Sequence, residues 1–223
     1  MLAGQSNAEG QALVYRTDNS PGTLDKVLQT DSVAASTFGA WAPTSRDASG
    51  RPSWPRREDV YVYYDSVWGL QAGALTAGFG AYGDSLHFGL EMEVGRLMGD
   101  FFDEPLLILK IAYGGKSLRN DFRPPSAGGT VGMYYTRLLE NYRAALANVG
   151  TAFPSLAGLP VLPAGFVWWQ GFNGERSTAR CVARCVDLDQ RHSPPRLLLT
   201  YSERPCLARV CCRLLLQLVL ASL

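Results

Sequence analysis

The stretch LLILKIAYGGKSL, residues 106–118, carries the strongest strand signal in this chain of 223 residues. Its first eight residues are almost all apolar, which is typical of a strand buried on both faces inside a parallel sheet. Gly114 and Gly115 follow where this strand ends. Ligands of open α/β sheets bind beyond the carboxyl ends of the strands. We therefore expect a backbone N–H of this pair to face a substrate, unless the glycines serve only the turn.

Further strands and helices alternate around this segment. Strands are predicted at 60–64 and 164–169, and helices at 86–98 and 133–149. Asp84 or Ser85 is available as N-cap of the first helix. Residues 10–58, with many Pro, Gly and polar residues, are expected to form an irregular loop. The alternation predicts an α/β domain with a mainly parallel sheet.

Charge is distributed unevenly along the chain. Residues 1–174 carry 10 Arg and 3 Lys against 16 acids, a net −3, whereas residues 175–223 carry 8 Arg against 4 acids, a net +4. The formal net charge of +1 argues against a nucleic-acid or anionic-membrane binder, since phosphate binding needs a concentrated basic surface. No apolar run reaches the roughly 18 to 20 residues that cross a bilayer, so no membrane span is expected.

The character of the sequence changes after Gly174. All five cysteines lie beyond it, and they show no paired C-x2-C spacing. Their odd number and spacing predict neither a disulfide framework nor a metal site, and no organic cofactor is implied. We therefore predict one domain at 1–174 and an anomalous Arg-, Cys- and Leu-rich tail at 175–223. The tail is either a terminal extension or the product of a wrong reading frame, and we favour the second.

LAGQSN, residues 2–7, is a candidate nucleophile motif. A nucleophilic serine needs a tight turn after a strand, where its hydroxyl is exposed and its backbone N–H helps to bind an oxyanion. Gly4 allows the chain to turn closely two residues before Ser6. By itself, however, the motif favours an ordinary polar turn.

WWQGFNG, residues 168–174, places further polar groups at the end of the next predicted strand. Gln170 and Asn173 can each donate a side-chain N–H to a developing negative charge. Trp168 and Trp169 offer aromatic surface against a sugar ring, although one of the two is expected to face the core.

Taken in order, these motifs resemble the sialate O-acetylesterase and carbohydrate esterase group of the SGNH hydrolases. The resemblance covers residues 2–174, including the loop KSLRNDFRPPS at 116–126. It implies a flavodoxin-like, three-layer α/β/α fold and a serine esterase that removes acetyl groups from O-acetylated carbohydrate, either sialic acid or a plant-type polysaccharide. It also implies that the oxyanion is bound by the N–H groups of Ser6 and Gly115, together with Gln170 or Asn173.

The chain departs from this family in three places. The strand before LAGQSN begins at Met1, so the amino end looks truncated, and localisation stays open because the family is often exported. Phe172 stands where many members have Glu. The family's Asp-x-x-His block follows elements that are missing here. The fold is therefore expected to be incomplete at both ends.

A serine nucleophile needs a base, usually a histidine oriented by a carboxylate, and the chain has two histidines. His192 follows Asp189 at the required spacing but lies in the tail, so the pair is either catalytic or a coincidence. His87 is expected on the helix at 86–98, at its surface or partly buried. Without a base, the chain would be an inactive carbohydrate-binding relic.

Two other motifs are interpreted as structural. GDSL at 83–86 is the nucleophile signature of a sister group, but no apolar strand precedes it, so Ser85 is expected to cap a helix. The glycines at 78, 80 and 83 match a dinucleotide fingerprint but lack its strand–turn–helix context. We expect neither a second nucleophile nor a dinucleotide site. The oligomeric state and the identity of the sugar are left open.

Overall fold

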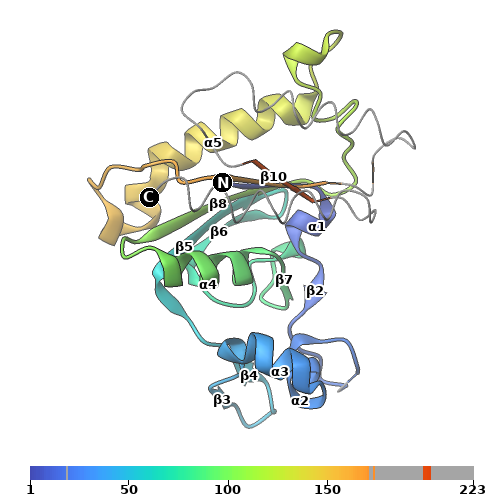
Figure 1. Ribbon diagram of the computed structural model, residues 1–223, viewed down its shortest axis with the longest axis vertical. Helices are drawn as coiled ribbons and strands as arrows, with labels where there is room; N and C mark the ends of the chain where they lie inside the picture. Colours follow the sequence, from blue (N-terminus) through green and yellow to red (C-terminus); the bar gives the residue numbers. More distant parts are fainter. Residues whose placement is uncertain (19, 171–172, 174–197, 202–223) are drawn as a thin grey trace. The chain divides into compact units, whose positions relative to one another are not determined.

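A computed structural model describes residues 1–18, 20–170, 173 and 198–201 of the chain (Figure 1). The chain divides into two compact units, which are described separately. We call residues 1–8 with the chain from 109 onward the parallel-sheet unit, and residues 9–108 the hairpin unit.

The larger helices and strands are divided between the two units. The parallel-sheet unit contains strands β1 Leu2–Gly4, β9 Phe166–Trp169 and β10 Leu198–Tyr201, most of strand β8 Leu106–Ala112, and helix α5 Met133–Ala152. The hairpin unit contains strands β5 Arg57–Ser66 and β6 Gly69–Leu75 and helix α4 Glu91–Phe101. The shorter elements are α1 Ser6–Glu9, β2 Ala12–Leu13, α2 Leu24–Thr30, α3 Ser32–Phe38, η1 Gly39–Trp41, β3 Ser45–Arg46, β4 Pro52–Ser53, η2 Ala81–Gly83, β7 His87–Phe88, η3 Pro125–Ala127 and η4 Pro154–Leu156.

The described strands confirm a mixed α/β architecture with a mostly parallel sheet. The strand order is β10-β9-β1-β8-β5-β6, and the boundary between the two units falls within β8. Strand β1 pairs in parallel with both β8 and β9, and β9 pairs in parallel with β10. Strands β5 and β6 form an antiparallel hairpin. The apolar runs predicted as buried strands at 106–113 and 164–169 correspond to β8 and β9.

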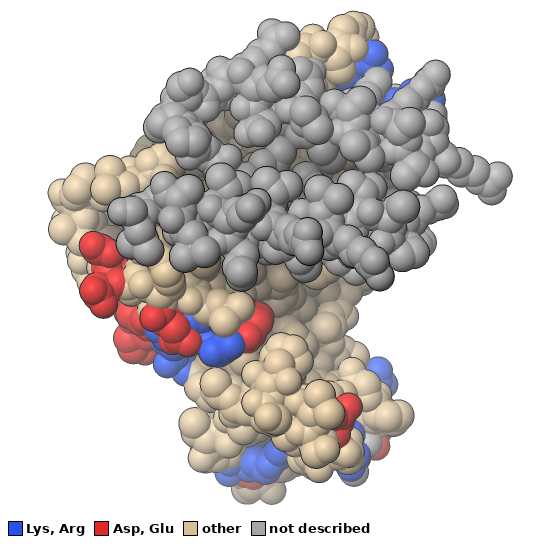
Figure 2. Space-filling view, in the orientation of Figure 1, with Lys and Arg blue, Asp and Glu red and all other residues tan. Residues whose placement is uncertain are grey.

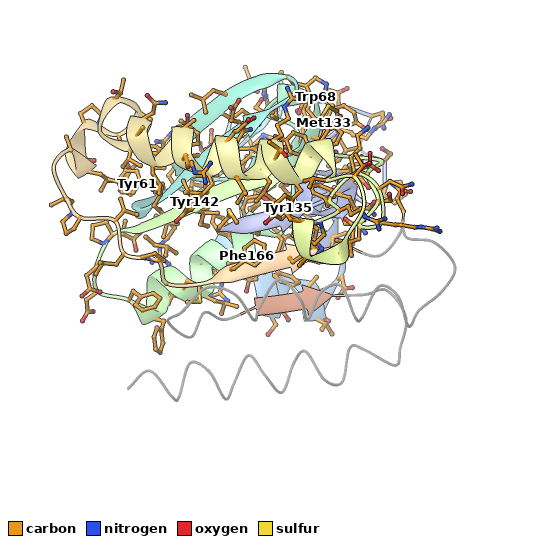
Figure 3. The ribbon with its side chains drawn as sticks, turned by 90° about the horizontal axis from the view of Figure 1, so that it is seen from above. Tyr61, Trp68, Met133, Tyr135, Tyr142 and Phe166 are labelled. Atoms are coloured by element: carbon orange, nitrogen blue, oxygen red, sulfur yellow. The ribbon has the colours of Figure 1, made fainter. Side chains whose placement is uncertain are left out.

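The core of the parallel-sheet unit lies between its strands and α5. Figure 3 shows α5 running along one face of these strands, with Tyr135 and Tyr142 on the helix and Phe166 at the start of β9. The buried residues of this core are Ala3, Ile111, Tyr113, Leu118, Phe122, Leu138 and Trp168. The helix predicted at 133–149 is therefore confirmed. It buries Leu138, Ala145 and Val149, and the other apolar residues of its stripe are partly buried.

In the hairpin unit, α4 packs closely on the β5–β6 hairpin. A Cβ atom on Gly95 would come within 2.4 Å of Leu75 and 3.3 Å of Val60, so the absence of a side chain permits this approach. Basic and acidic side chains gather on the visible face of the unit (Figure 2). Arg57 pairs with Asp59 and Asp100, and Arg96 pairs with Glu93 and Asp100. These arginines are compensated by acids and form no unopposed basic surface.

The prediction of an irregular loop at 10–58 is wrong in part. Helix α2 begins after Thr23, whose hydroxyl accepts a hydrogen bond from the N–H of Lys26 at 3.2 Å. Helix α3 begins after Asp31, whose carboxylate accepts from the N–H groups of Val33 and Ala34 at 2.9 and 3.0 Å. Such side-chain caps satisfy the unpaired N–H groups of a first turn, and they stabilise helices here that are too short to show periodicity.

The helix predicted at 86–98 begins five residues later, at Glu91. Asp84 accepts hydrogen bonds from the backbone N–H groups of Leu86 and His87 at 2.8 and 3.1 Å, which closes a turn and does not cap a helix. His87 and Phe88 then form β7, which pairs with β2. The expectation that His87 lies on a helix is therefore wrong, although its side chain is partly buried, as expected.

No helix among the described residues is long and apolar enough to cross a membrane. In the same part of the chain, no group of three or more His, Cys, Asp or Glu side chains is arranged to hold a metal ion.

Candidate functional site

The carboxyl ends of three parallel strands meet at one edge of the sheet in the parallel-sheet unit. Gly4, the last residue of β1, is in register with Ala112 of β8 and with Trp169 of β9. Ser6 lies two residues after Gly4, and Gly114 lies two residues after Ala112. Register therefore brings the serine and the glycine pair, more than 100 positions apart in the sequence, to the same level beyond the sheet.

The turn that carries Ser6 depends on Gly4. Gly4 has φ +153°, and a Cβ atom there would lie 2.0 Å from the carbonyl oxygen of Trp169. This approach lets the N–H of Gln5 donate to the same oxygen at 3.3 Å, while the carbonyl of Gly4 accepts from Tyr113 at 3.1 Å. Ser6 follows as the first residue of α1 and is half-buried. The serine therefore leaves the strand on a turn fixed from both neighbouring strands.

Gly115 and Asn173 lie next to each other at this edge. Gly115 has φ +71°, a left-handed conformation that favours glycine, and it is exposed. The side-chain nitrogen of Asn173 is 4.0 Å from the position that a Cβ atom of Gly115 would take. Two of the predicted oxyanion groups, one from the β8 exit and one from the β9 exit, are thus neighbours.

Gln170 contacts the glycine loop and is almost fully buried, with 5% of its surface exposed. Its Nε2 donates to the carbonyl of Lys116 at 2.8 Å, and its Oε1 has no hydrogen-bond partner among the described residues. The amide that was predicted as an oxyanion donor therefore ties the end of β9 to the loop after β8. This contact spans 54 positions, so no local sequence signal indicates it.

The segment after the glycine pair is held by several contacts. The ammonium group of Lys116 lies 4.6 Å from the centre of the Tyr134 ring, so this lysine contacts an aromatic face. Asp121 accepts hydrogen bonds from the N–H and the hydroxyl of Ser117 at 2.8 and 2.9 Å. The loop that carries Gly115 is therefore anchored on both sides.

One of the two tryptophans of WWQGFNG faces the core, as predicted. Trp168 is 3% exposed and packs edge to face on Phe122, with ring centroids 5.0 Å apart. Trp169 is half-buried.

The predicted base and its partner, His192 and Asp189, lie outside the described residues. Four residues of the tail, those of β10, pair in parallel with β9. Within the described residues, the parallel-sheet unit thus contributes a serine, a glycine loop and two amides to one edge.

A carboxylate–imidazole pair that sequence analysis missed lies in the hairpin unit. Nδ1 of His87 is 2.8 and 3.0 Å from the two carboxylate oxygens of Asp84. Burial raises the pKa of Asp84, but hydrogen bonds from the His87 side chain and the Leu86 backbone outweigh it and leave the pKa below its usual value. The signal was available, because Asp84 and His87 have the Asp-x-x-His spacing that we sought beyond the W-x-Q-G block.

In the described residues, the two motifs interpreted as structural lack the context that their signatures require. The prediction that Ser85 caps a helix is wrong, because its hydroxyl accepts a hydrogen bond from Arg51 at 2.9 Å. The glycines at 78, 80 and 83 lie between β6, an antiparallel strand, and β7, so the strand–turn–helix context of a dinucleotide fingerprint is absent from this described segment.

No known protein family, curated protein or solved structure matches this chain significantly.

Proposed function

We propose that the chain is a serine esterase of the SGNH type, with a flavodoxin-like three-layer fold, that removes acetyl groups from O-acetylated carbohydrate. One observation supports this most: the strand ends that carry Ser6, Gly115 and Asn173 meet at one edge of the sheet. Acyl transfer needs a nucleophile beside N–H donors that are fixed before the reaction begins.

In the proposed reaction, the Ser6 hydroxyl oxygen bonds to the acetyl carbonyl carbon, and its proton passes to His192, which Asp189 orients. The carbonyl oxygen becomes an oxyanion that accepts hydrogen bonds from the N–H groups of Ser6 and Gly115 and from the amide of Asn173. The carbon–oxygen bond to the sugar then breaks, and His192 returns the proton to the departing sugar oxygen. A water molecule releases acetate from Ser6 by the same steps.

Gln170 has a positioning role in this proposal. Its Nε2 fixes the carbonyl of Lys116, and that carbonyl belongs to the residue directly after Gly115. The direction of the Gly115 N–H depends on the orientation of this short segment. If a hydrogen-bond donor is misplaced by about 1 Å, the rate can fall on the order of 100-fold. We therefore expect loss of the hydrogen bond from Gln170 to lower kcat.

The proposal is tested by acetate release from acetylated xylan and from 4-nitrophenyl acetate. The full chain is expected to hydrolyse both, and Ser6→Ala is expected to lose on the order of 1,000-fold or more of kcat. Ser85→Ala is the matched control, since this serine stands in a GDSL motif, and it should keep the full rate. Equal rates for the chain and for Ser6→Ala would refute the esterase and favour the inactive carbohydrate-binding relic.

The base is tested with the two histidines. With 4-nitrophenyl acetate as substrate, His192→Ala is expected to remove most of the activity, whereas His87→Ala is expected to keep it. The opposite result would contradict His192 as the base and make the spacing of Asp189 and His192 a coincidence.

A further inference from the structure

Two exposed aromatic rings lie against each other in the hairpin unit. Trp68 is in the turn that joins β5 to β6 (Figure 3), and 43% of its surface is exposed. Tyr82, from η2, is 51% exposed. Their ring centroids are 5.3 Å apart and their planes are inclined by 58°. Adjacent exposed rings of this size commonly mark a binding surface.

The backbone segments that carry the two rings are held in place. The N–H of Trp68 donates to the hydroxyl of Ser66 at 3.1 Å, and that hydroxyl donates to the carbonyl of Gly69 at 3.0 Å. Tyr82 has φ +67°, the one positive value among the described non-glycine residues. Gly83 follows with φ +65°, and a Cβ atom there would lie 2.9 Å from the Cβ of Trp68. Such strain at a bulky residue is typical of ligand-binding segments.

Polar groups border the aromatic pair on the side of Tyr82. The imidazole of His87 packs edge to face on the Tyr82 ring, with centroids 4.8 Å apart. Its Nδ1 is engaged by Asp84, so Nε2 is the second hydrogen-bonding atom of this ring, whose side chain is 15% exposed. Rings that can pack against the C–H face of a sugar therefore lie beside a fixed hydrogen-bonding group.

We infer that Trp68 and Tyr82, with His87 and Asp84, form a binding site for a pyranose ring of a neutral carbohydrate chain. The rings supply apolar contact to the C–H face of the sugar, and the imidazole hydrogen-bonds a hydroxyl. The imidazole is paired with the Asp84 carboxylate, so these four residues offer no unpaired positive charge that would favour an acidic sugar. The choice of carbohydrate as ligand rests on the proposed function, but the site is defined by residues outside the strand-end site.

Binding of unacetylated xylohexaose to the full chain, measured by isothermal titration calorimetry, tests this inference. Saturable binding is expected, with affinity lowered at least 10-fold by Trp68→Ala and by Tyr82→Gly. Val67→Ala is the matched control, because Val67 is a neighbouring residue, 57% exposed and apolar without a ring. It should change the affinity less than twofold. Tyr82→Gly removes a ring and relieves a left-handed backbone, so it decides the question if Trp68→Ala does not fold.

Three results would overturn the inference. The first is the absence of saturable xylohexaose binding, or binding that neither aromatic substitution changes. The second is equal affinity for N-acetylneuraminic acid, which would contradict a neutral ligand. The third is a concentration-dependent dimer abolished by Val67→Ala and Trp68→Ala alike, which would make the patch an interface between copies of this chain. Xylohexaose contains no ester, so its binding can fail while acetyl-ester hydrolysis persists, or persist when hydrolysis fails.

Discussion

In each of two regions of this molecule, a glutamine side chain holds a loop by hydrogen bonds to its backbone carbonyls. We call each such contact a clamp, and the two loops have different proposed roles. In the parallel-sheet unit, Gln170 donates its Nε2 hydrogen to the carbonyl of Lys116. In the hairpin unit, Gln71 donates its Nε2 hydrogens to the carbonyls of Gly78 and Asp84 at 3.0 and 3.3 Å. The first clamp holds a glycine loop beside a serine. The second holds the segment that presents Tyr82 and His87.

The surroundings of the clamps differ. At the strand ends, backbones approach so closely that a Cβ atom on Gly4 would overlap the carbonyl of Trp169. In the hairpin unit, the rings of Trp68 and Tyr82 remain about half exposed on turns. Close backbone packing suits the positioning of a reacting atom, whereas exposed ring area suits the binding of a sugar face. We therefore expect substitutions in the first region to change the rate, and substitutions in the second to change affinity.

The largest expected effect is on stability, from Gly4→Ala. The added methyl group would lie 2.0 Å from the carbonyl oxygen of Trp169, so the β1–β9 contact must open. We expect a loss of about 3–5 kcal/mol in the free energy of unfolding, measured by urea denaturation. Gly128→Ala is the control, since Gly128 has φ +66° with nothing within 4 Å of its Cβ position, and it should cost only about 1 kcal/mol. Equal losses in the two variants would show that backbone conformation, and not close packing, is the reason why position 4 requires glycine.

Replacing each of the two glutamines by methionine tests whether the two clamps have separate roles. Gln170→Met leaves the carbonyl of Lys116 without this hydrogen bond. We expect kcat for 4-nitrophenyl acetate to fall about 10- to 100-fold while KM changes little. This fall corresponds to about 1–3 kcal/mol in the activation free energy. Gln71→Met is the matched substitution, and it should weaken xylohexaose binding by a similar factor while kcat stays constant. If both variants lower kcat equally, the two clamps do not have separate roles.

The smallest expected effect is the acid response of the hairpin unit. The pKa of Asp84 is lowered in the folded chain, so its stabilising contribution is complete above the unfolded value of 3.8 and is lost as pH falls through the folded value. Because 37% of the Asp84 side chain is exposed, the contribution is only about 0.5 kcal/mol. The protection factors of the Leu86 and His87 amides, corrected for the intrinsic pH dependence of exchange, should fall below pH 4, and Asp84→Asn should remove most of that dependence.

The sequence predicts those parts of the molecule whose signals are local. The apolar run of β8, the apolar run of β9 and the stripe of α5 each bury a face that can be recognised within a dozen residues, and all three are found where predicted. Helices α2 and α3 were missed because each has 7 residues and depends on a side-chain cap.

The candidate site was predictable as residue types but not as contacts. Ser6, Gly115 and Asn173 were recognisable because a polar or glycine motif follows a strand. The bond from Gln170 to Lys116 joins two strand exits and depends on register, which is a property of the assembled sheet. His87 was misplaced because the hydrogen bonds of Asp84 prevail over the helical periodicity at 86–90.

Covalent trapping of the serine tests the central claim most directly. A fluorophosphonate reacts with an activated serine hydroxyl, so that a bond forms between the serine oxygen and phosphorus while fluoride leaves with the proton. We predict one adduct per chain, located by peptide mass spectrometry at Ser6, and a lower labelling rate in Gln170→Met. No adduct on the folded chain, or equal labelling of Ser6 and Ser85, would contradict the account.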